Sequence, residues 1–201
     1  MASPAAARSA PLQPEDWIQA AKTRLAREGI DAVRIEVLCR DLGVSKGSFY
    51  WHFRDREDLL HGLLSQWEKA EEDWFKEAQS HERSAAARWA RLVERGSQRE
   101  QMRLEAAIRA WARQDDRVAK RVAGVERNQR EHIAGILTEI GFTRRIAEEW
   151  SETALLLYLG WLDRATRDPE SQLSGRALSD YLSELILAAS ARSGNSAPEL
   201  E

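Results

Sequence analysis

The sequence predicts an all-α protein of nine helices, with a small N-terminal domain followed by a larger helical domain. Its composition favours helices, because Ala, Leu, Arg and Glu are abundant while the 201 residues include only five Pro and eleven Gly. Apolar residues recur at the three- and four-residue intervals of amphipathic helices, and no long stretch alternates with the period of two that is typical of strands. Hydrophobic residues form 43% of the chain, which is enough to build a core.

The N-terminal residues predict an arm and one helix. Residues 1–12 are mostly Ala, Ser and Pro, so we expect a disordered arm. Its Arg8 suits the minor groove of DNA, although an inert tail is the simpler interpretation. A helix then starts near Pro14, since proline suits the first helical position, and it ends at Gly29. Its apolar face consists of Trp17, Ile18, Ala21 and Leu25.

Residues 34–60 predict a helix-turn-helix unit followed by a longer helix. Gly43 interrupts the apolar positions where a first short helix would end, as expected of a glycine in the left-handed conformation. Ser45 follows at an N-cap position, where its hydroxyl can accept a hydrogen bond from an amide of the second helix. Phe49 and Phe53, four residues apart, form the buried stripe of that helix. A helix roughly 10 Å long suits entry into a major groove about 12 Å wide.

The positions outside this buried stripe predict a DNA-contacting face for a DNA-binding domain of residues 13–54. Cations, hydroxyls, a phenol and an imidazole are groups that bond phosphate oxygens or base edges. A glycine among them lets the backbone approach DNA closely. We expect Arg56, in the first turn of the following helix, to project toward the DNA. The alternative is a solvated helix face that binds nothing. The candidate contacts are Arg34, Ser45, Lys46, Gly47, Ser48, Tyr50, Trp51, His52 and Arg56.

Residues 43–60 read GVSKGSFYWHFRDREDLL, which resembles the signature of the TetR/AcrR family of transcriptional regulators. The resemblance extends over residues 17–67. It implies a TetR-like fold, in which the three N-terminal helices bind a palindromic operator and the C-terminal domain dimerises and binds a small ligand. Two positions differ from the family pattern. Arg34 stands where a Thr or Ser often caps the helix, and Cys39 stands where a small Ala or Ser is usual.

The charge distribution predicts DNA recognition through a few placed cations rather than through a basic domain. The formal net charge is −3, and the first 61 residues hold as many Asp and Glu as Lys and Arg. Because non-specific affinity for DNA is mostly phosphate electrostatics, the cations near the motif must supply the attraction. These cations are Arg34, Lys46, Arg54 and Arg56.

Three features predict a cytoplasmic protein with no membrane partner. The single Cys cannot form an internal disulfide, so a reducing compartment suits the chain. The first residues lack the apolar core of a signal peptide. No segment approaches the roughly 18 uncharged apolar residues of a membrane-spanning helix, the longest being residues 153–162.

Residues 55–190 predict a helical ligand-binding and dimerisation domain, and residues 191–201 a tail. A long helix from Asp55 to about Gln79 links this domain to the DNA-binding domain, and four further helices precede a final amphipathic one. The helix of residues 150–165 is apolar nearly all round, so it must be buried on several sides. The family resemblance implies that the last two long helices pair with their copies in a homodimer. The predicted interface residues are Leu155, Leu159, Leu162, Leu178, Leu182 and Leu185.

Eight Trp residues, most of them in the C-terminal part, predict a ligand cavity in that domain. Each Trp alone is better explained by core packing, but together they would line a site for an apolar or aromatic molecule. A polar break in the apolar stripe of residues 115–140 would supply polar groups, and a turn that faces solvent explains this break equally well. The predicted ligand residues are Trp67, Trp89, Trp111, Asn128, Gln129, His132 and Tyr158.

The sequence predicts no metal site, cofactor or catalytic site. Its four His residues lack the paired spacing of metal ligands, and no zinc-protease, hydrolase or Walker motif occurs. Cys39 is better explained as a small buried residue than as a redox sensor.

We therefore predict a homodimeric transcriptional regulator rather than an enzyme. It is expected to act as a repressor that binds a palindromic operator in double-stranded DNA and is released by a small-molecule effector. The alternative keeps the DNA-binding dimer and gives the C-terminal domain a protein partner. A closed cavity lined by Trp would favour the effector, whereas a filled core with an exposed apolar patch would favour the protein partner.

Overall fold

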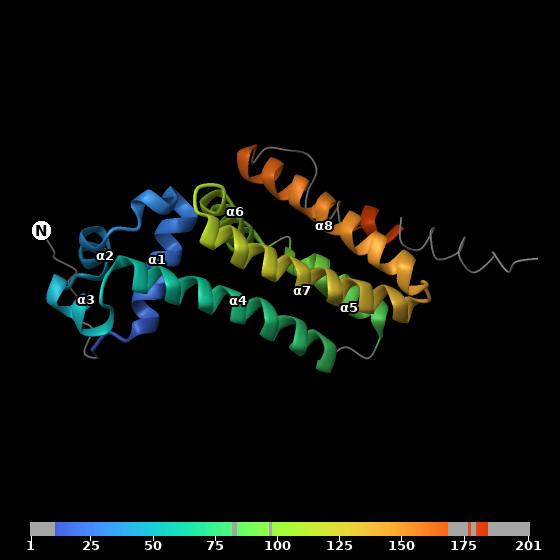
Figure 1. Cartoon of the computed structure of the whole chain (residues 1–201), viewed down its shortest axis with the longest axis horizontal. Coiled ribbons are helices and arrows are strands. Elements are labelled where there is room, and N and C mark those ends of the chain that lie inside the picture. The colour runs from blue at the N-terminus through green and yellow to red at the C-terminus, as the bar shows by residue number, and fades with distance from the viewer. Residues whose placement is uncertain (1–10, 82–83, 97, 169–176, 178–179, 185–201) are drawn as a thin grey trace, which may run out of the picture. The chain divides into compact units, whose positions relative to one another are not determined.

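The computed structural model describes residues 11–81, 84–96, 98–168, 177 and 180–184 (Figure 1). Over these residues the chain forms helices and no strand, which confirms the predicted all-α class. No helix among them is apolar over a length that would cross a membrane. The predicted arm up to residue 10, with Arg8, and the predicted tail lie outside the described residues.

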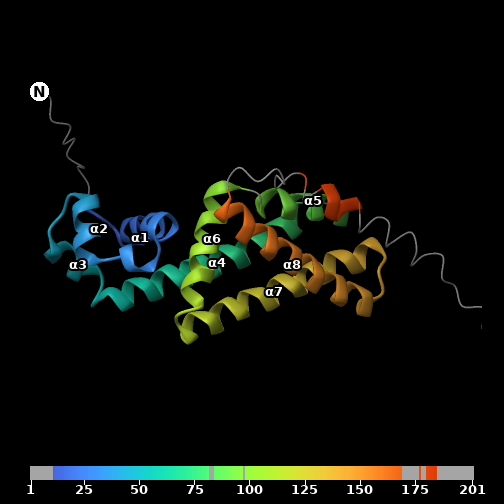
Figure 2. The ribbon, with the colours of Figure 1, turned by 90° about the horizontal axis from the view of Figure 1, so that it is seen from above.

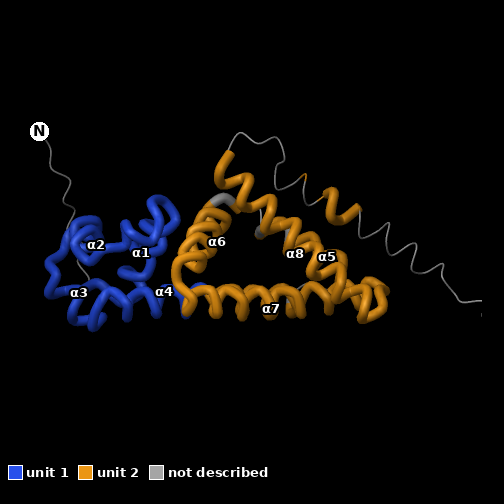
Figure 3. The backbone as a smooth tube through the Cα atoms, turned by 45° about the horizontal axis from the view of Figure 1, so that its top comes forward, with its two compact units in different colours: residues 1–67 blue, residues 68–201 orange. Residues whose placement is uncertain are grey.

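The chain divides into two compact units, Met1–Trp67 and Glu68–Glu201, which Figure 3 colours separately. The division falls within one long helix, whereas the predicted domain boundary falls at the start of that helix. The first unit contains α1 (Pro14–Glu28), the 3-10 helix η1 (Ile30–Ala32), α2 (Ile35–Leu42), α3 (Lys46–His52) and the first part of α4 (Arg56–His81). The second unit contains the rest of α4, then α5 (Ala85–Gly96), α6 (Arg99–Ala112), α7 (Asp116–Ile140) and α8 (Arg144–Arg167). Residues 180–184 are also helical.

The turn between α2 and α3 forms as the sequence predicts. Gly43 has a φ of 70° and lies in the left-handed region, where a side chain would be strained. The amide of Val44 then donates to the carbonyl of Cys39 at 2.9 Å, which closes the end of α2. At the other end of α3, Asp55 precedes α4, and its carboxylate accepts from the amide of Asp58 at 2.8 Å. The carboxylate therefore satisfies an amide that the first turn of α4 leaves free.

Aromatic rings fill the core of the first unit. The rings of Trp17 and Phe49 meet edge to face with their centroids 5.3 Å apart, and Phe53 stacks on Phe49 at 5.6 Å. Trp17 and Phe49 are fully buried, so α3 is fixed against α1 through its apolar stripe. The opposite face of α3 is left for solvent or a ligand.

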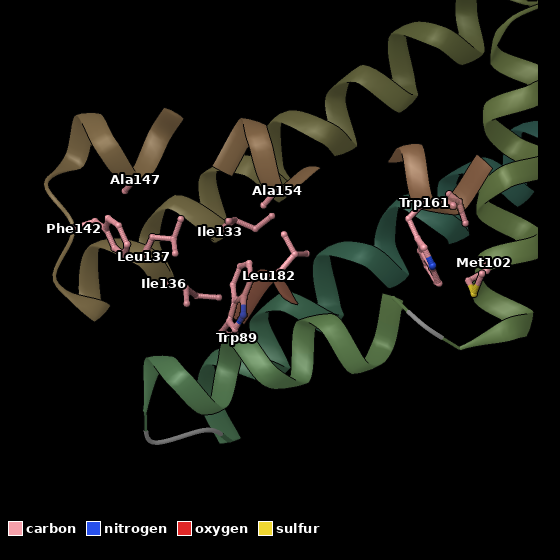
Figure 4. Packing of buried hydrophobic residues seen from close by; sticks show 11 residues of the cluster. Trp89, Met102, Ile133, Ile136, Leu137, Phe142, Ala147, Ala154, Trp161 and Leu182 are labelled. Atoms are coloured by element: carbon pink, nitrogen blue, oxygen red, sulfur yellow. The ribbon is translucent and has the colours of Figure 1, made fainter. Parts of the chain in front are cut away.

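A second hydrophobic core holds α5, α6, α7 and α8 together (Figure 4). Helices α7 and α8 pack against each other near the turn that joins them, as Figure 2 also shows. The turn between them is again set by a glycine, Gly141, with a φ of 119°. The buried members of this core include Trp89, Ile133, Leu137, Phe142, Trp161, Leu162 and Leu182.

Candidate functional site

The first candidate site is the exposed face of α3. The side chain of Trp51 is 86% exposed and that of Tyr50 is 57% exposed, although both neighbour the buried Phe49. Such exposed aromatic side chains are uncommon on a surface that has nothing to bind. Of the other predicted contacts, Arg34, Ser45, Lys46 and Gly47 are exposed, and Ser48 and His52 are half-buried.

Ser45 is the N-cap residue of α3, but it does not cap the helix as expected. Its backbone is extended, and its hydroxyl accepts no capping hydrogen bond. The amide of Ser48 instead donates to the carbonyl of Ser45 at 3.1 Å. The Ser45 hydroxyl therefore makes no capping hydrogen bond. It lies at the N-terminus of α3, where free backbone amides suit a phosphate.

Lys46 is held by a carboxylate from α2. Its Nζ lies 2.7 Å from Oε1 of Glu36, and both side chains are more than half exposed. This hydrogen bond lowers the pKa of the Glu36 carboxyl. The acid orients the amine on the exposed face, but it also competes with any phosphate for the same positive charge.

Replacing Glu36 by Gln is therefore expected to strengthen DNA binding about two- to fivefold. In the variant, Lys46 no longer has to give up an exposed ion pair with Glu36 before it can bind a phosphate. Fluorescence anisotropy of a labelled operator at low salt measures the change. A double variant with Lys46→Ala serves as the control, since without the amine the Glu36→Gln substitution has nothing to release. Unchanged or weaker binding in the single variant would contradict this account of Lys46.

Arg56 does not project toward a ligand as predicted. Its Nε donates to the carbonyl oxygen of Val33 at 2.6 Å, and its Nη2 donates to that of Ile30 at 2.8 Å. The guanidinium thus ties the first turn of α4 to Ile30, where η1 begins, and to Val33, which follows η1. We accordingly remove Arg56 from the proposed DNA contacts and treat it as a residue that positions α4 within the first unit.

The variant Arg56→Met is expected to destabilise the first unit by about 1.5–3 kcal/mol, because it removes hydrogen bonds from a charged donor to two carbonyl groups. Hydrogen exchange measured by mass spectrometry should show faster exchange across η1 and the start of α4. Arg54→Met is the matched control, since the Arg54 side chain is 85% exposed. Equal exchange in the two variants would show that the Arg56 contacts do not matter.

The second candidate site is a pocket of about 380 Å³ between α4 and α7 in the second unit. Three predicted ligand residues, Asn128, Gln129 and His132, line it together. Sequence reasoning missed the α4 wall of this pocket, because acidic residues on a helix usually indicate a solvated face. That wall consists of Glu68, Glu71, Glu72 and Phe75.

The aromatic residues that were predicted to bind ligand do not line this pocket. Trp89 belongs to the hydrophobic core, and its Nε1 donates to Oγ of Ser183 at 3.0 Å. Trp67 and Trp111 are also buried, Trp67 in the first unit. Tyr158 donates its hydroxyl proton to Glu105 at 2.7 Å. These four residues therefore pack in or against the core and do not line the pocket.

Two buried carboxylates carry a polar network through the second unit. Glu71 accepts from Arg95 at 2.6 Å and from Gln101 at 2.8 Å, so α4, α5 and α6 meet at this side chain. Burial raises the pKa of Glu71, and Arg95 opposes that shift. Glu105 is also buried and pairs with Arg109 at 2.9 Å. Buried acids with partners on several helices are candidates for ligand recognition.

The residues predicted for a dimer interface are mostly covered by this chain's own core. Leu155, Leu162 and Leu182 are buried within this chain and Leu159 is half-buried, while Leu178 and Leu185 lie outside the described residues. Among the described residues of the second unit, the large apolar side chains that remain exposed are Leu156 at 59%, Leu157 at 39% and Tyr181 at 56%. Because α8 is apolar nearly all round, its sequence does not indicate which face packs against the chain's own core. The predicted and the exposed apolar residues therefore differ.

Within the part of the chain that the structure describes, no group of three or more His, Cys, Asp or Glu side chains is arranged to hold a metal ion.

The N-terminal sequence is similar to known regulatory proteins. Residues 18–63 match the family described as bacterial regulatory proteins, tetR family. A segment of 52 residues, 26% of this chain, is 40% identical to the tetracycline repressor protein class A from transposon 1721 of Escherichia coli. That match spans 24% of the repressor's own length.

Solved structures share the fold over most of the chain. A transcriptional regulator from Saccharomonospora viridis in complex with choline has a TM-score of 0.75 at 19% identity, covering 87% of this chain and 95% of that one. A regulator from Rhodococcus sp. Rha1 has a TM-score of 0.72 at 18% identity, covering 93% and 100% of the two chains. A TetR-family regulator from Streptomyces coelicolor has a TM-score of 0.72 at 14% identity, covering 92% of each. At these identities the likeness establishes the fold.

Proposed function

We propose that this chain, whose residues 18–63 match the tetR family of bacterial regulatory proteins, is a repressor that binds a near-palindromic operator as a homodimer. Members of this family are transcriptional regulators and not enzymes. The observation that carries the proposal is the structure of α3, in which Phe49 is fully buried while Tyr50 and Trp51 are exposed. A helix fixed on one side by aromatic packing presents a rigid opposite face to the major groove. We also propose that it acts in the cytoplasm, where a bacterial regulator meets its operator.

The proposed DNA contacts combine the exposed polar groups of α3 with the residues around the turn. Lys46 and Arg34 supply charge for phosphate oxygens, and the aromatic side chains supply apolar surface and a hydroxyl for base edges. We include the half-buried Ser48 and His52, because a small rotation of the side chain would bring their polar atoms to a groove. The proposed set is Arg34, Ser45, Lys46, Gly47, Ser48, Tyr50, Trp51 and His52.

We propose that a small molecule binds the second unit and releases the operator. The pocket between α4 and α7 supports this, because α4 also begins in the DNA-binding unit and so belongs to both. The similar regulator from Saccharomonospora viridis was solved in complex with choline, which supports a small polar effector. The lining of the pocket is mostly polar, so we revise the expected effector from a largely apolar molecule to a polar one. To release the DNA, the effector must bind the DNA-free arrangement more tightly than the DNA-bound one.

We propose that the exposed side chains of Leu156, Leu157 and Tyr181 form one apolar patch that serves as a protein interface. We assign it to a second copy of this chain, because two copies would place two α3 helices on the two halves of a palindrome. A different protein partner on the same patch is the second candidate function. The number of chains in the complex distinguishes the two.

Sedimentation of the purified chain is expected to give twice the chain mass of 22.9 kDa. Leu156→Asp should return the mass to that of one chain, because a charge would then be buried in the interface, and it should weaken operator binding in parallel. Leu156→Met is the matched control and should remain dimeric. A single-chain mass for the unchanged protein would favour the partner-protein alternative.

A further inference from the structure

We propose that the effector is an organic ammonium ion with at least one N–H group, bound in the pocket between α4 and α7 by Glu71 and Gln129. The inference rests on the proposed sensing function of the second unit and names the chemical class of its ligand. It follows from three features of the pocket. One hydrogen-bond acceptor has no donor, a buried carboxylate can accept a further hydrogen bond, and most of the other charged groups that line the pocket are paired.

The unpartnered acceptor is the amide oxygen of Gln129. This side chain is 9% exposed and lines the pocket, and its Oε1 has no hydrogen-bond donor among the residues that the structure describes. Its Nε2 donates to Oε2 of Glu71 at 3.3 Å, so the amide orientation is set by the carboxylate. A buried acceptor without a donor is unfavourable, and a ligand that brings an N–H group would satisfy it.

The buried carboxylate is Glu71. Arg95 and Gln101 both donate to its Oε1, whereas the donor described at Oε2 is the long bond from Gln129. The oxygen that faces the pocket residue Gln129 therefore has an unused lone pair. Burial raises the pKa of Glu71 in spite of Arg95. A cationic ligand beside the carboxylate would favour the ionised form, which burial disfavours.

Apart from Arg127, the other charged groups that line the pocket are paired with an opposite charge, Glu72 with Lys76 among them. Glu68 forms two hydrogen bonds with Arg121, at 2.6 and 2.7 Å, so this acid and this base neutralise each other. His132 donates from Nδ1 to the carbonyl of Asn128 at 2.6 Å, which leaves Nε2 as a second acceptor. The ring of His132 stacks on Phe75 with the centroids 4.5 Å apart.

Size and polarity limit the ligand further. The pocket volume of about 380 Å³ lies at the small end of ligand sites, and the pocket is open to solvent on one side. Phe75 and Val125 supply apolar surface for a short hydrocarbon or aryl group. Arg127 also lines the pocket and opposes a positive ligand, so removing its charge should tighten binding.

Isothermal titration calorimetry of the full chain tests the inference with three probes that share one phenyl group. The probes are 2-phenylethylammonium chloride, its N,N,N-trimethyl analogue and 2-phenylethanol. We expect the ammonium ion to bind at least about tenfold more tightly than either other probe, because only it combines a positive charge with N–H donors. Equal affinity for the alcohol, or for the trimethyl analogue, would overturn the inference.

Four variants locate the site. Glu71→Gln and Gln129→Met should each weaken binding of the ammonium probe at least about tenfold, while Arg127→Gln should strengthen it. Glu152→Gln is the control, since it removes the same charge on α8 outside the pocket and should leave the affinity within about twofold. Circular dichroism confirms folding, and Gln129→Met keeps the test valid if Glu71→Gln does not fold. A folded Gln129→Met variant with full affinity would overturn the assignment.

Operator binding measured on the same preparations separates this inference from the proposed function. Tight operator binding with no affinity for the ammonium probe would overturn the ligand class and leave the DNA-binding regulator intact. Absence of operator binding would count against the proposed function whatever the calorimetry shows.

Discussion

Replacement of Phe49 by Ala is expected to destabilise the first unit by about 3–5 kcal/mol, the largest stability effect of any single substitution proposed for this chain. Phe49 is fully buried, and its ring contacts both Trp17 and Phe53. Its removal leaves a cavity between α1 and α3 that the short helix α3 cannot fill. Because a small helical unit has little stability in reserve, we expect α1, α2 and α3 to unfold and operator binding to be lost.

Hydrogen exchange of the full chain, followed by mass spectrometry, measures this effect unit by unit. Peptides from residues 14–52 should lose their protection, while peptides from α7 and α8 should keep theirs, because those helices have a separate core. Trp51→Ala is the matched control on the same helix and should change stability by about 0.5 kcal/mol or less, since Trp51 is 86% exposed. Retained protection of α3 in Phe49→Ala would refute this account of the unit's core.

The double substitution of Lys46 and Tyr50 by Ala is expected to weaken operator binding roughly 100-fold while leaving the chain folded. Both side chains lie on the exposed face of α3, so their removal opens no cavity. Lys46 supplies a charge for phosphate, and Tyr50 supplies a hydroxyl and a ring for a base edge. The loss should include a shallower dependence of affinity on salt, because one fewer counterion is released.

Anisotropy titrations of a labelled operator at several salt concentrations measure both effects. Lys69→Ala with Lys76→Ala is the control, since these exposed lysines pair with acids on α4 of the second unit. Normal operator affinity in the Lys46 and Tyr50 double variant, with unchanged circular dichroism, would show that α3 is not the recognition helix.

The helix-turn-helix unit is predictable from the sequence because its signals are local. A glycine at position 43 marks the left-handed turn, and two phenylalanines four residues apart mark the buried stripe of a short helix. Both features depend on neighbours within one or two helical turns. The structure confirms them with a φ of 70° at Gly43 and with the burial of Phe49 and Phe53.

Features that depend on distant residues are not predictable in this way. The two carbonyls that hold Arg56 lie 23 and 26 positions earlier in the chain, so the sequence gives no sign that its guanidinium turns inward. Glu71 is similar, because a glutamate on an amphipathic helix normally indicates solvent. Its burial is set by partners on α5, α6 and α7. The polar break at Asn128, Gln129 and His132 is a local signal, and these residues do line one pocket.

Selection of bound sequences from a random double-stranded DNA library tests the central claim most directly. The unchanged chain is expected to enrich a near-palindromic site whose half-sites lie about one helical turn apart, roughly 10 base pairs, or a multiple of it. The Lys46 and Tyr50 double variant should enrich no sequence under the same conditions. Failure of the unchanged chain to enrich any sequence, or enrichment of the same site by the double variant, would contradict a DNA-reading role for α3.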